Sequence, residues 1–400
     1  MSDRVSLGDY AEITTGYPFK SSGYSEGSGI RLLRGDNIGQ GKIRWEGSKT
    51  WPATEYASYS QYQLQVGDVI LAMDRPWIEA GLKYAVLRRA DIPSLLVQRV
   101  ACLRARDGLD QEFLTCIIAG QDFTNYVLGQ QTGTAVPHIS ARQISDYAFR
   151  LPSLKAQRAI GRILGALDDK IAVNDGVSRT SLALADAEFS REAASLPLGT
   201  ATFGSVAQIF GGGTPSTTEP VYWHGEIAWA TPSDVTALNS PYLFGTSRAI
   251  TQLGLDSCSS QLFSAGSIFM TSRATIGSFA INRIPAAVNQ GFIVVVPPDE
   301  ELRWWLFHEM RSRIDDMVSL ANGSTFLELS RGNFKAMPVR MGGAESIRRF
   351  AQLAGPLHDR AAIAAQESAA LGELRDTLLP RLMSGQLKVR DAEKIAEDAT

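Results

Sequence analysis

Cysteine and histidine are scarce in this 400-residue sequence, which limits the kinds of site it can build. The cysteines form no Cys-X-X-Cys pair, so the sequence predicts no structural zinc site or disulfide scaffold and favours a reducing compartment; they are Cys102, Cys116 and Cys258. The histidines stand far apart along the chain, and we expect no metal site from them; they are His138, His224, His308 and His358.

Long apolar runs and an excess of either charge are also missing. We find no run of about eighteen apolar residues, no charged-then-apolar start and no lipidation motif, and therefore expect a cytoplasmic protein without a membrane span. The formal net charge is −3. Such a weak overall field does not attract nucleic acid, so any nucleic-acid binding has to come from a local patch or from a partner.

Motifs for catalysis are weak or absent. Gly23-Tyr24-Ser25-Glu26-Gly27 matches a nucleophile elbow but lacks the strand before and the helix after it, which favours a loop. Gly211-Gly212-Gly213-Thr214-Pro215 is either an ordinary turn or a backbone anion contact, without the lysine of a P-loop. The pairs Asp168-Asp169 and Asp315-Asp316 lie on predicted helices with basic neighbours, which is typical of a solvated face. No Asn-Pro-Pro-Tyr-like tetrad for methyl transfer occurs, and we expect no catalytic centre.

The sequence does contain a long internal repeat. The start Leu7-Gly8-Asp9-Tyr10-Ala11-Glu12-Ile13 is echoed by Phe203-Gly204-Ser205-Val206-Ala207-Gln208-Ile209. Later the two copies keep one constant offset, which pairs Gly133 with Gly323, Ser140 with Ser330, Arg150 with Arg340, Arg158 with Arg348, Gly165 with Gly355, Leu167 with Leu357, Asp169 with Asp359 and Ala172 with Ala362. So many identities exceed what composition gives. We interpret the chain as a tandem duplication, in which each half is a globular module followed by a long helix.

Each module has the pattern of a mixed α/β domain rich in short strands. The clearest predicted strands are Ile30 to Leu33, Val69 to Ala72, Tyr84 to Arg88, Arg99 to Arg104, Ile227 to Ala230, Ser267 to Thr271 and Gly291 to Val296. One amphipathic helix is predicted late in each module, over Gln111 to Ile118 and Leu302 to Met317.

Two long helices follow the modules, from Leu154 to about Ala194 and from about Ser346 to Met383. Their apolar residues recur at helical spacing and predict an antiparallel pair; those assigned to pairing or partner binding are Ile160, Leu164, Leu167, Ile171, Phe350, Leu357, Leu371 and Leu378. Pro356 predicts a bend, and Gly165 and Gly355 predict a close backbone approach. The tail Val389 to Thr400 is helical by pattern but lacks an apolar stripe.

Loops at matched points of both copies carry residue types that read DNA. Arginine reads guanine and Asn or Gln reads adenine, while Ser, Thr and Lys fix phosphates. The candidate DNA-binding residues are Arg31, Arg34, Asn37, Lys42, Arg44, Arg75, Gln98, Arg99, His138, Arg142 and Gln143 in the first copy, and Ser233, Arg248, Thr271, Ser272, Arg273, Asn289, Gln290, Ser324, Thr325, Arg331, Asn333 and Lys335 in the second.

The chain resembles the specificity subunits of type I restriction-modification systems over nearly its whole length. The most specific segments are Leu151-Pro152-Ser153-Leu154-Lys155-Ala156-Gln157-Arg158-Ala159-Ile160 and Leu379-Pro380-Arg381-Leu382-Met383-Ser384-Gly385. Ala156 departs from the acid usual in the family, and Met341 to Ile347 replaces a clear Leu-Pro opening. The start of the second long helix is therefore the weakest part of the match.

The resemblance implies an α+β fold with two repeated target recognition domains, two long helices forming an antiparallel coiled coil, and a pseudo-two-fold relation. The implied segments are 1–150, 151–197, 198–341, 342–388 and a tail, 389–400. It also implies a non-catalytic subunit that reads bipartite double-stranded DNA and binds two methyltransferase subunits, joined by nuclease-translocase (restriction) subunits. S-adenosylmethionine and ATP belong to those partners, and no cofactor is expected in this chain. The alternative is a coiled-coil scaffold whose modules bind a ligand other than DNA.

Overall fold

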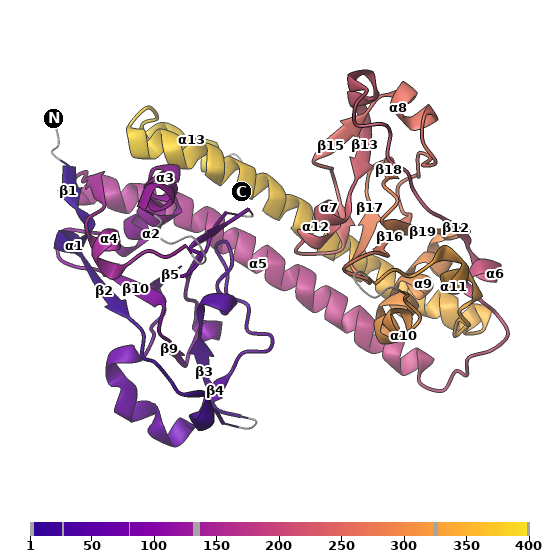
Figure 1. The fold of residues 1–400 in the computed structure, drawn as a ribbon, viewed down its shortest axis with the longest axis horizontal. Helices are drawn as coiled ribbons and strands as arrows, with labels where there is room; N and C mark the ends of the chain where they lie inside the picture. The colour runs from indigo at the N-terminus through magenta and orange to yellow at the C-terminus, as the bar shows by residue number, and fades with distance from the viewer. Residues whose placement is uncertain (1–3, 26–27, 80, 131–136, 323–326, 398–400) are drawn as a thin grey trace. The chain divides into compact units, whose positions relative to one another are not determined.

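The computed structural model describes residues 4–25, 28–79, 81–130, 137–322 and 327–397. By its internal contacts the chain forms two compact units, residues 1–169 with 371–400, and residues 170–370. Each unit contains one globular module and a stretch of both long helices, α5 (Leu154–Ala193) and α12 (Ala344–Ser384) (Figure 1). The predicted segment boundaries stay predictions, since these units cut across the helices instead of following the chain.

The first module is built on two small sheets. Strand order β2-β10-β5-β8 makes an antiparallel sheet, and β4-β3-β9 makes a second one in which β3 and β9 run parallel. The elements are β1 (Arg4–Ser6), α1 (Leu7–Tyr10), β2 (Ala11–Thr15), β3 (Ile30–Leu33), β4 (Thr50–Trp51), β5 (Val69–Ala72), β6 (Trp77–Ile78), β7 (Gly81–Leu82), β8 (Tyr84–Val86), β9 (Ser94–Leu96), β10 (Val100–Ala105), α2 (Gln111–Ala119), α3 (Gln121–Gln130), α4 (Ala141–Ser145) and β11 (Ala148–Arg150), with 3-10 turns at Ser21–Gly23, Gly35–Asn37, Ala53–Tyr62 and Arg89–Asp91.

The second module repeats this plan, which confirms the tandem duplication. Order β12-β19-β16-β17 matches the first sheet, with β14 added, and β15-β13-β18 matches the second, including its parallel pair. The elements are α6 (Phe203–Val206), β12 (Gln208–Phe210), β13 (Trp223–Ala230), α7 (Pro232–Thr236), β14 (Tyr242–Leu243), β15 (Arg248–Ile250), α8 (Gln252–Asp256), β16 (Ile268–Thr271), β17 (Phe279–Asn282), β18 (Ala286–Val288), β19 (Phe292–Val296), α9 (Glu300–Ser312), α10 (Ile314–Ser319) and α11 (Arg331–Ala336), with a 3-10 turn at Pro220–Tyr222; α13 (Val389–Glu397) ends the described chain.

The predicted strands are confirmed, and a turn glycine opens the central strand of each copy. Gly67 and Gly266 both have φ near +90°, a region open to glycine but costly for other residues, and β5 and β16 follow them directly. One helix prediction is wrong. Leu302 to Met317 forms two helices, because Arg313 leaves helical geometry with φ −123° and ψ 27° between α9 and α10. Helix α12 continues through Pro356 without interruption.

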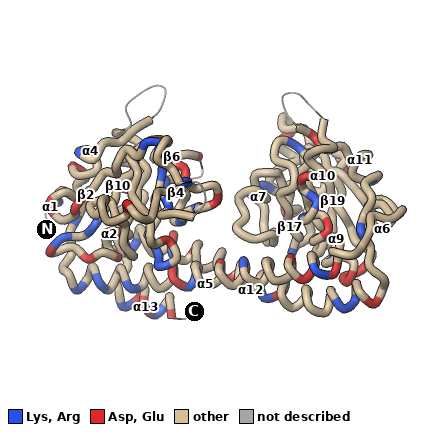
Figure 2. Tube along the Cα trace, turned by 90° about the horizontal axis from the view of Figure 1, so that it is seen from below, with Lys and Arg blue, Asp and Glu red and all other residues tan. Residues whose placement is uncertain are grey.

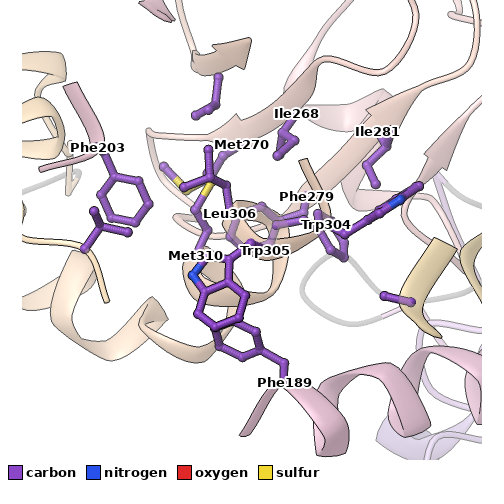
Figure 3. Packing of buried hydrophobic residues seen from close by; sticks show 14 of the residues in the cluster. Phe189, Phe203, Ile268, Met270, Phe279, Ile281, Trp304, Trp305, Leu306 and Met310 are labelled. Atoms are coloured by element: carbon purple, nitrogen blue, oxygen red, sulfur yellow. The ribbon is translucent and has the colours of Figure 1, made fainter. Parts of the chain in front are cut away.

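The core of the second unit draws side chains from α5, α9, α12 and the sheet. Phe189 of α5 packs edge-on against Trp305 of α9, with ring centroids 5.1 Å apart (Figure 3). Phe350 of α12 lies 5.5 Å from the same phenylalanine ring. The long helices are therefore part of the module's core in this unit.

In the first unit, buried Gln157 fastens α5 to the module. Its side chain accepts a hydrogen bond from the Asp110 backbone N–H (2.9 Å) and donates to the carbonyls of Gly108 and Pro152. One turn later, Gly161 lies against α2, where a Cβ would come within 2.7 Å of the Glu112 Cβ and 3.2 Å of the Phe113 nitrogen. The close backbone approach predicted at Gly165 and Gly355 is wrong, because a Cβ added at either glycine would meet only side-chain atoms, at 3.8 and 3.4 Å.

The two long helices pack antiparallel within each unit. In the second unit Asn174 donates to Glu367 (2.7 Å), and Glu192 accepts from Ser346 and Arg349. In the first unit Arg375 contacts Asp168 (2.7 Å). The apolar residues assigned to pairing are buried inside the chain, fully at Ile160, Leu164, Leu167, Phe350, Leu371 and Leu378 and partly at Ile171 and Leu357. Ala392 of α13 is also buried, so the tail helix does have one packed position.

The prediction that the histidines are isolated from one another is wrong. His308 of α9 and His358 of α12 face each other with their Nε2 atoms 2.9 Å apart. Asp186 of α5 lies 2.6 Å from the His308 Nδ1, and the Tyr242 hydroxyl lies 2.8 Å from the His358 Nδ1. Residues from four elements thus form one polar chain that is buried except at Asp186, and the wide sequence spacing concealed it.

The geometry assigns the protons along this chain. A carboxylate only accepts, so the His308 Nδ1 donates to Asp186. Burial disfavours charge on either ring, and a neutral His308 accepts at Nε2 from His358, whose Nδ1 accepts from Tyr242. Burial lowers the pKa of His308 and lowers that of His358 well below its ordinary value. Burial would raise the pKa of Asp186, but hydrogen bonds from His308 and Arg311 outweigh it and lower that pKa to about 2.

Gly161→Ala tests the α2–α5 contact, with Gly165→Ala as its matched control. Alanine favours a helix over glycine by about 1 kcal/mol, but at Gly161 its Cβ would collide with α2. We expect a net loss of about 1–3 kcal/mol in the free energy of unfolding at Gly161 and a small gain at Gly165. Urea unfolding measures both, and equal effects of the two substitutions would contradict the packing described.

The histidine chain predicts acid sensitivity of the second unit. Above pH 6.5 the histidines are neutral in the folded and unfolded chain; below it the unfolded chain takes up protons that the folded one does not, so the free energy of unfolding falls with falling pH. The contribution of Asp186 is lost only below pH 3.8. Hydrogen exchange of α9 amides between pH 7.5 and 5.5 should show progressive loss of protection.

His358→Phe should reduce the fall in the free energy of unfolding with falling pH. At pH 7.5 it should cost about 1–3 kcal/mol, because the Tyr242 hydroxyl and the His308 Nε2 lose their partner. His138→Gln removes a histidine of the first unit and is the control, in which the pH dependence of α9 amide exchange should match the wild type. An unaltered slope in His358→Phe would disprove the assigned neutral pair.

Candidate nucleic-acid interface

A corner of the first module brings three distant segments together. The backbone N–H of Met73, at the end of β5, donates to the Arg99 carbonyl before β10 (2.9 Å). Ile139 donates to the Met73 carbonyl (2.9 Å), and Arg75 donates to that of Pro137 (2.7 Å). These bonds fix the loop before α4 against the ends of two central strands.

The second module builds the same corner with the same three bonds. Ser272 donates to Gly291 (2.8 Å), Leu329 donates to Ser272 (2.9 Å), and Ala274 donates to Leu327 (3.1 Å). Arg75 and Ala274 occupy the matching position and both have positive φ, 43° and 59°. Such a conformation is uncommon outside glycine and often marks functional sites, so its recurrence supports a shared role.

The residue at the strand end is an acid in the first corner and an arginine in the second. In the first, Asp74 at the strand end binds Arg99 (3.0 Å) and His138 (2.6 Å). In the second, Arg273 stands at the strand end and binds Glu328 through two nitrogens, at 2.9 and 2.8 Å. The Arg99, Arg273 and Glu328 side chains are each 45% or more exposed. Two corners of one design therefore present different donors and acceptors.

Basic side chains also surround a shallow cavity beside β3. It has a volume of about 340 Å³ and is lined by Arg34, Asp36, Asn37, Arg44, Glu46, Gly47, Ser48 and Lys49. Asn37 frames its wall, since its side chain accepts from the Arg34 N–H and donates to the Arg44 carbonyl. The cavity has both signs of charge, which suits a ligand with several polar groups better than a simple anion.

An arginine stacks on tryptophan beside the smaller sheet of each module. Arg31 lies 4.3 Å from the ring centroid of Trp45 in the first, and Arg248 lies 3.8 Å from that of Trp223 in the second. The Arg31 guanidinium also donates to the Ala90 carbonyl. Stacking holds these guanidinium groups in fixed orientation.

Comparison with known proteins identifies the family. The profile of the type I restriction modification DNA specificity domain matches residues 2–179 and 199–341. The chain belongs to this family. It is 33% identical over 190 residues to the type I restriction enzyme EcoAI specificity subunit of Escherichia coli, covering 45% of this chain and 31% of that protein. It is 32% identical over 148 residues to the MjaIX specificity subunit of Methanocaldococcus jannaschii, covering 36% and 34%. These matches span about a third of each relative's length.

The fold is that of a solved type I specificity subunit. The S subunit of the M. genitalium type I restriction-modification system superposes with a TM-score of 0.57 over 95% of both chains, at 13% identity. A likeness at this identity concerns the fold alone. It confirms two mixed modules joined to long helices.

Some candidate residues of this specificity-domain protein serve the scaffold instead of its surface. Asn37, Thr271 and Ser272 are buried, and Gln143 closes the N-terminal turn of α4 by accepting from Ser140. Asn289 accepts from the Gly291 N–H, and Asn333 donates to the Leu320 carbonyl. Ser324 and Thr325 lie outside the described residues. The exposed candidates are Lys42, Arg44, Arg75, Gln98, Arg99, Arg142, Ser233, Arg248, Arg273, Gln290, Arg331 and Lys335.

Sequence reasoning missed the two acids that hold the corner cations, Asp74 and Glu328. A search for residue types that read DNA selects cations and amides and passes over carboxylates. Asp74 and Arg273 do occupy matching places after equivalent strands, and that opposition of charge was the available signal. Figure 2 shows α4, which follows the first corner, on the side of its module away from α5.

The weaker catalytic motifs have structural explanations. The Ser25 hydroxyl donates to Thr50 (2.8 Å) within a loop, although Glu26 and Gly27 lie outside the described residues. The Gly213 N–H already donates to the Val288 carbonyl, which favours a packed turn over an anion contact. Within the described ranges no group of three or more His, Cys, Asp or Glu side chains is arranged to hold a metal, and no helix is long and apolar enough to cross a membrane.

Proposed function

We propose that this chain is the DNA-recognition subunit of a type I restriction-modification complex, in which each module reads one half of a bipartite target. The observation that carries the proposal is the recurrent corner, built by identical backbone bonds in both modules and bearing different charged groups. Arginine pairs with guanine O6 and N7, and a carboxylate accepts from cytosine N4. Corners of one geometry but different chemistry suit two half-sites of different sequence.

The charge balance assigns the phosphate contacts largely to partners. A chain of net charge −3 cannot neutralise many phosphates. Two methyltransferase subunits would dock on the paired helices and supply much of the salt-dependent affinity, together with restriction subunits. The helices would set the spacing between half-sites. S-adenosylmethionine and ATP would be bound by those partners in the cytoplasm, and this chain itself would be non-catalytic.

Arg99→Ala and Arg273→Ala should each relax recognition in one half of the target. Losing a bidentate base contact costs about 1–3 kcal/mol at one position, whereas each exposed ion pair contributes only about 0–1 kcal/mol to stability. Methylome sequencing of cells carrying each variant should show degeneracy at one position, in opposite halves of the motif.

The control for these variants is Arg348→Ala, which removes an exposed ion-paired arginine of α12 away from either corner. It should leave the methylated motif unchanged. If the two corner variants give the wild-type motif, or if both alter the same half of the motif, the corners do not read the bases. An unchanged methylome on deletion of this chain would favour the non-DNA scaffold instead.

The isolated chain should bind its target weakly and the assembly tightly. Filter-binding titrations over a range of salt should give a steeper salt dependence for the assembly, because more phosphates are neutralised. Comparable affinity and salt slope with and without methyltransferase subunits would contradict the division of labour proposed.

A further inference from the structure

A small β-ribbon in the first module presents apolar side chains to solvent. Strands β6 and β7 pair antiparallel, with Trp77 opposite Leu82 and Ile78 opposite Gly81, and join no other sheet among the described strands. Trp77 is 37% exposed and Ile78 is 41% exposed, whereas Leu82 is buried. Neighbouring residues of a strand point to opposite faces, so Trp77 shares a face with Leu82 and Ile78 lies on the other face.

Loops that carry charges of both signs adjoin this ribbon. Arg75 precedes it, belongs to the corner with Arg99, and forms no side-chain hydrogen bond or ion pair with the residues the structure describes. The Gln40 side chain donates to the Gly81 carbonyl (3.4 Å), which joins the ribbon to the loop that carries Arg34, Asp36 and Arg44. Glu79 adds an acid at the ribbon turn. Figure 2 shows β6 on the same side of the module as α4, away from α5.

The second module has no such ribbon. Its β16 ends at Thr271 and β17 begins at Phe279, and the short connection, all of it described, contains no strand pair. In the first module the equivalent connection, from Ala72 to Tyr84, carries the whole ribbon. The ribbon is therefore an addition to one copy of the duplicated design, placed directly after its corner.

We propose that the β6–β7 ribbon is a wedge, and that Trp77 packs against a partly unstacked base step in the half-site bound by the first module. This rests on the proposed DNA-reading function. Partial unstacking of a base step exposes an apolar base face between the phosphates of the groove, which suits an exposed tryptophan beside Arg75. The position of the ribbon directly after the corner of the first module favours DNA over a protein partner as its contact. Unstacking would occur in one half-site only, since the second module lacks the ribbon.

The test uses the chain assembled with its methyltransferase subunits and a duplex carrying the motif recovered by methylome sequencing. 2-Aminopurine is placed at successive positions of the half-site that Arg99→Ala relaxes, avoiding the methylated base. Binding should raise fluorescence at one step. Trp77→Ala should abolish that rise and weaken binding roughly 10-fold, as expected for a lost aromatic–base contact, while Trp77→Phe keeps part of both.

Leu253→Ala, an exposed apolar residue of the second module, is the matched control and should change neither signal. An unchanged rise and affinity in Trp77→Ala would overturn the wedge while leaving DNA reading intact. The wedge would also be overturned if Trp77→Ala kept the fluorescence rise but no longer co-purified with the methyltransferase subunits. The ribbon would then be a protein contact. Failure of the wild-type assembly to bind the motif would instead overturn the proposed function. Thermal unfolding of Trp77→Phe and Trp77→Ala separates these outcomes from misfolding.

Discussion

The structure depends on covering the apolar faces of two long helices. A 40-residue helix is about 60 Å long, and its stability comes from packing of its apolar face. Helix α5 meets this demand with different partners along its length. Near its start Gln157 and Gly161 fix it to α2, and further on Phe189 enters the core of the second unit. Along the way Asp168 and Asn174 contact α12. The core of each module is thus completed by one part of each long helix, while the other part of the same helix belongs to the other unit. Neither module is an independent domain on a flexible linker.

Buried polar contacts make this arrangement specific. An apolar stripe alone tolerates a shift along the partner helix, but a buried hydrogen bond left without its partner is costly. Gln157 satisfies both ends of its amide at one register only. In the second unit, the Asp186–His308–His358–Tyr242 chain does the same for α5, α9, α12 and β14. Its donors and acceptors run in a single direction, so a proton added at His308 Nε2 meets the N–H of His358 and breaks the bond between the two rings.

The architecture was predictable from the sequence, whereas the site was predictable only in part. The repeat, the strands opened by Gly67 and Gly266, and both long helices follow from local patterns that the fold preserves. Contacts between distant positions do not. His308 and His358 are 50 residues apart, and no spacing rule places their rings face to face. For the same reason Asn37, Thr271 and Ser272 had the right chemistry to read DNA but are buried, and the acids Asp74 and Glu328 were overlooked although they orient the exposed arginines.

The corners show how one duplicated framework can acquire two specificities. The three backbone bonds that shape the corner do not depend on side chains, so residues displayed on it can change without refolding the module. Asp74 in one copy is matched by Arg273 in the other, and each is balanced by the opposite charge on the facing loop. Because the balancing charge lies within the same corner, neither Asp74 nor Arg273 is left without an opposite charge. The length of the connection that follows the corner also differs between the copies. It carries the β6–β7 ribbon in the first copy and is a short turn in the second. A corner whose backbone stays fixed while its side chains and loop length change allows the DNA target to change without altering the surfaces that bind partner subunits.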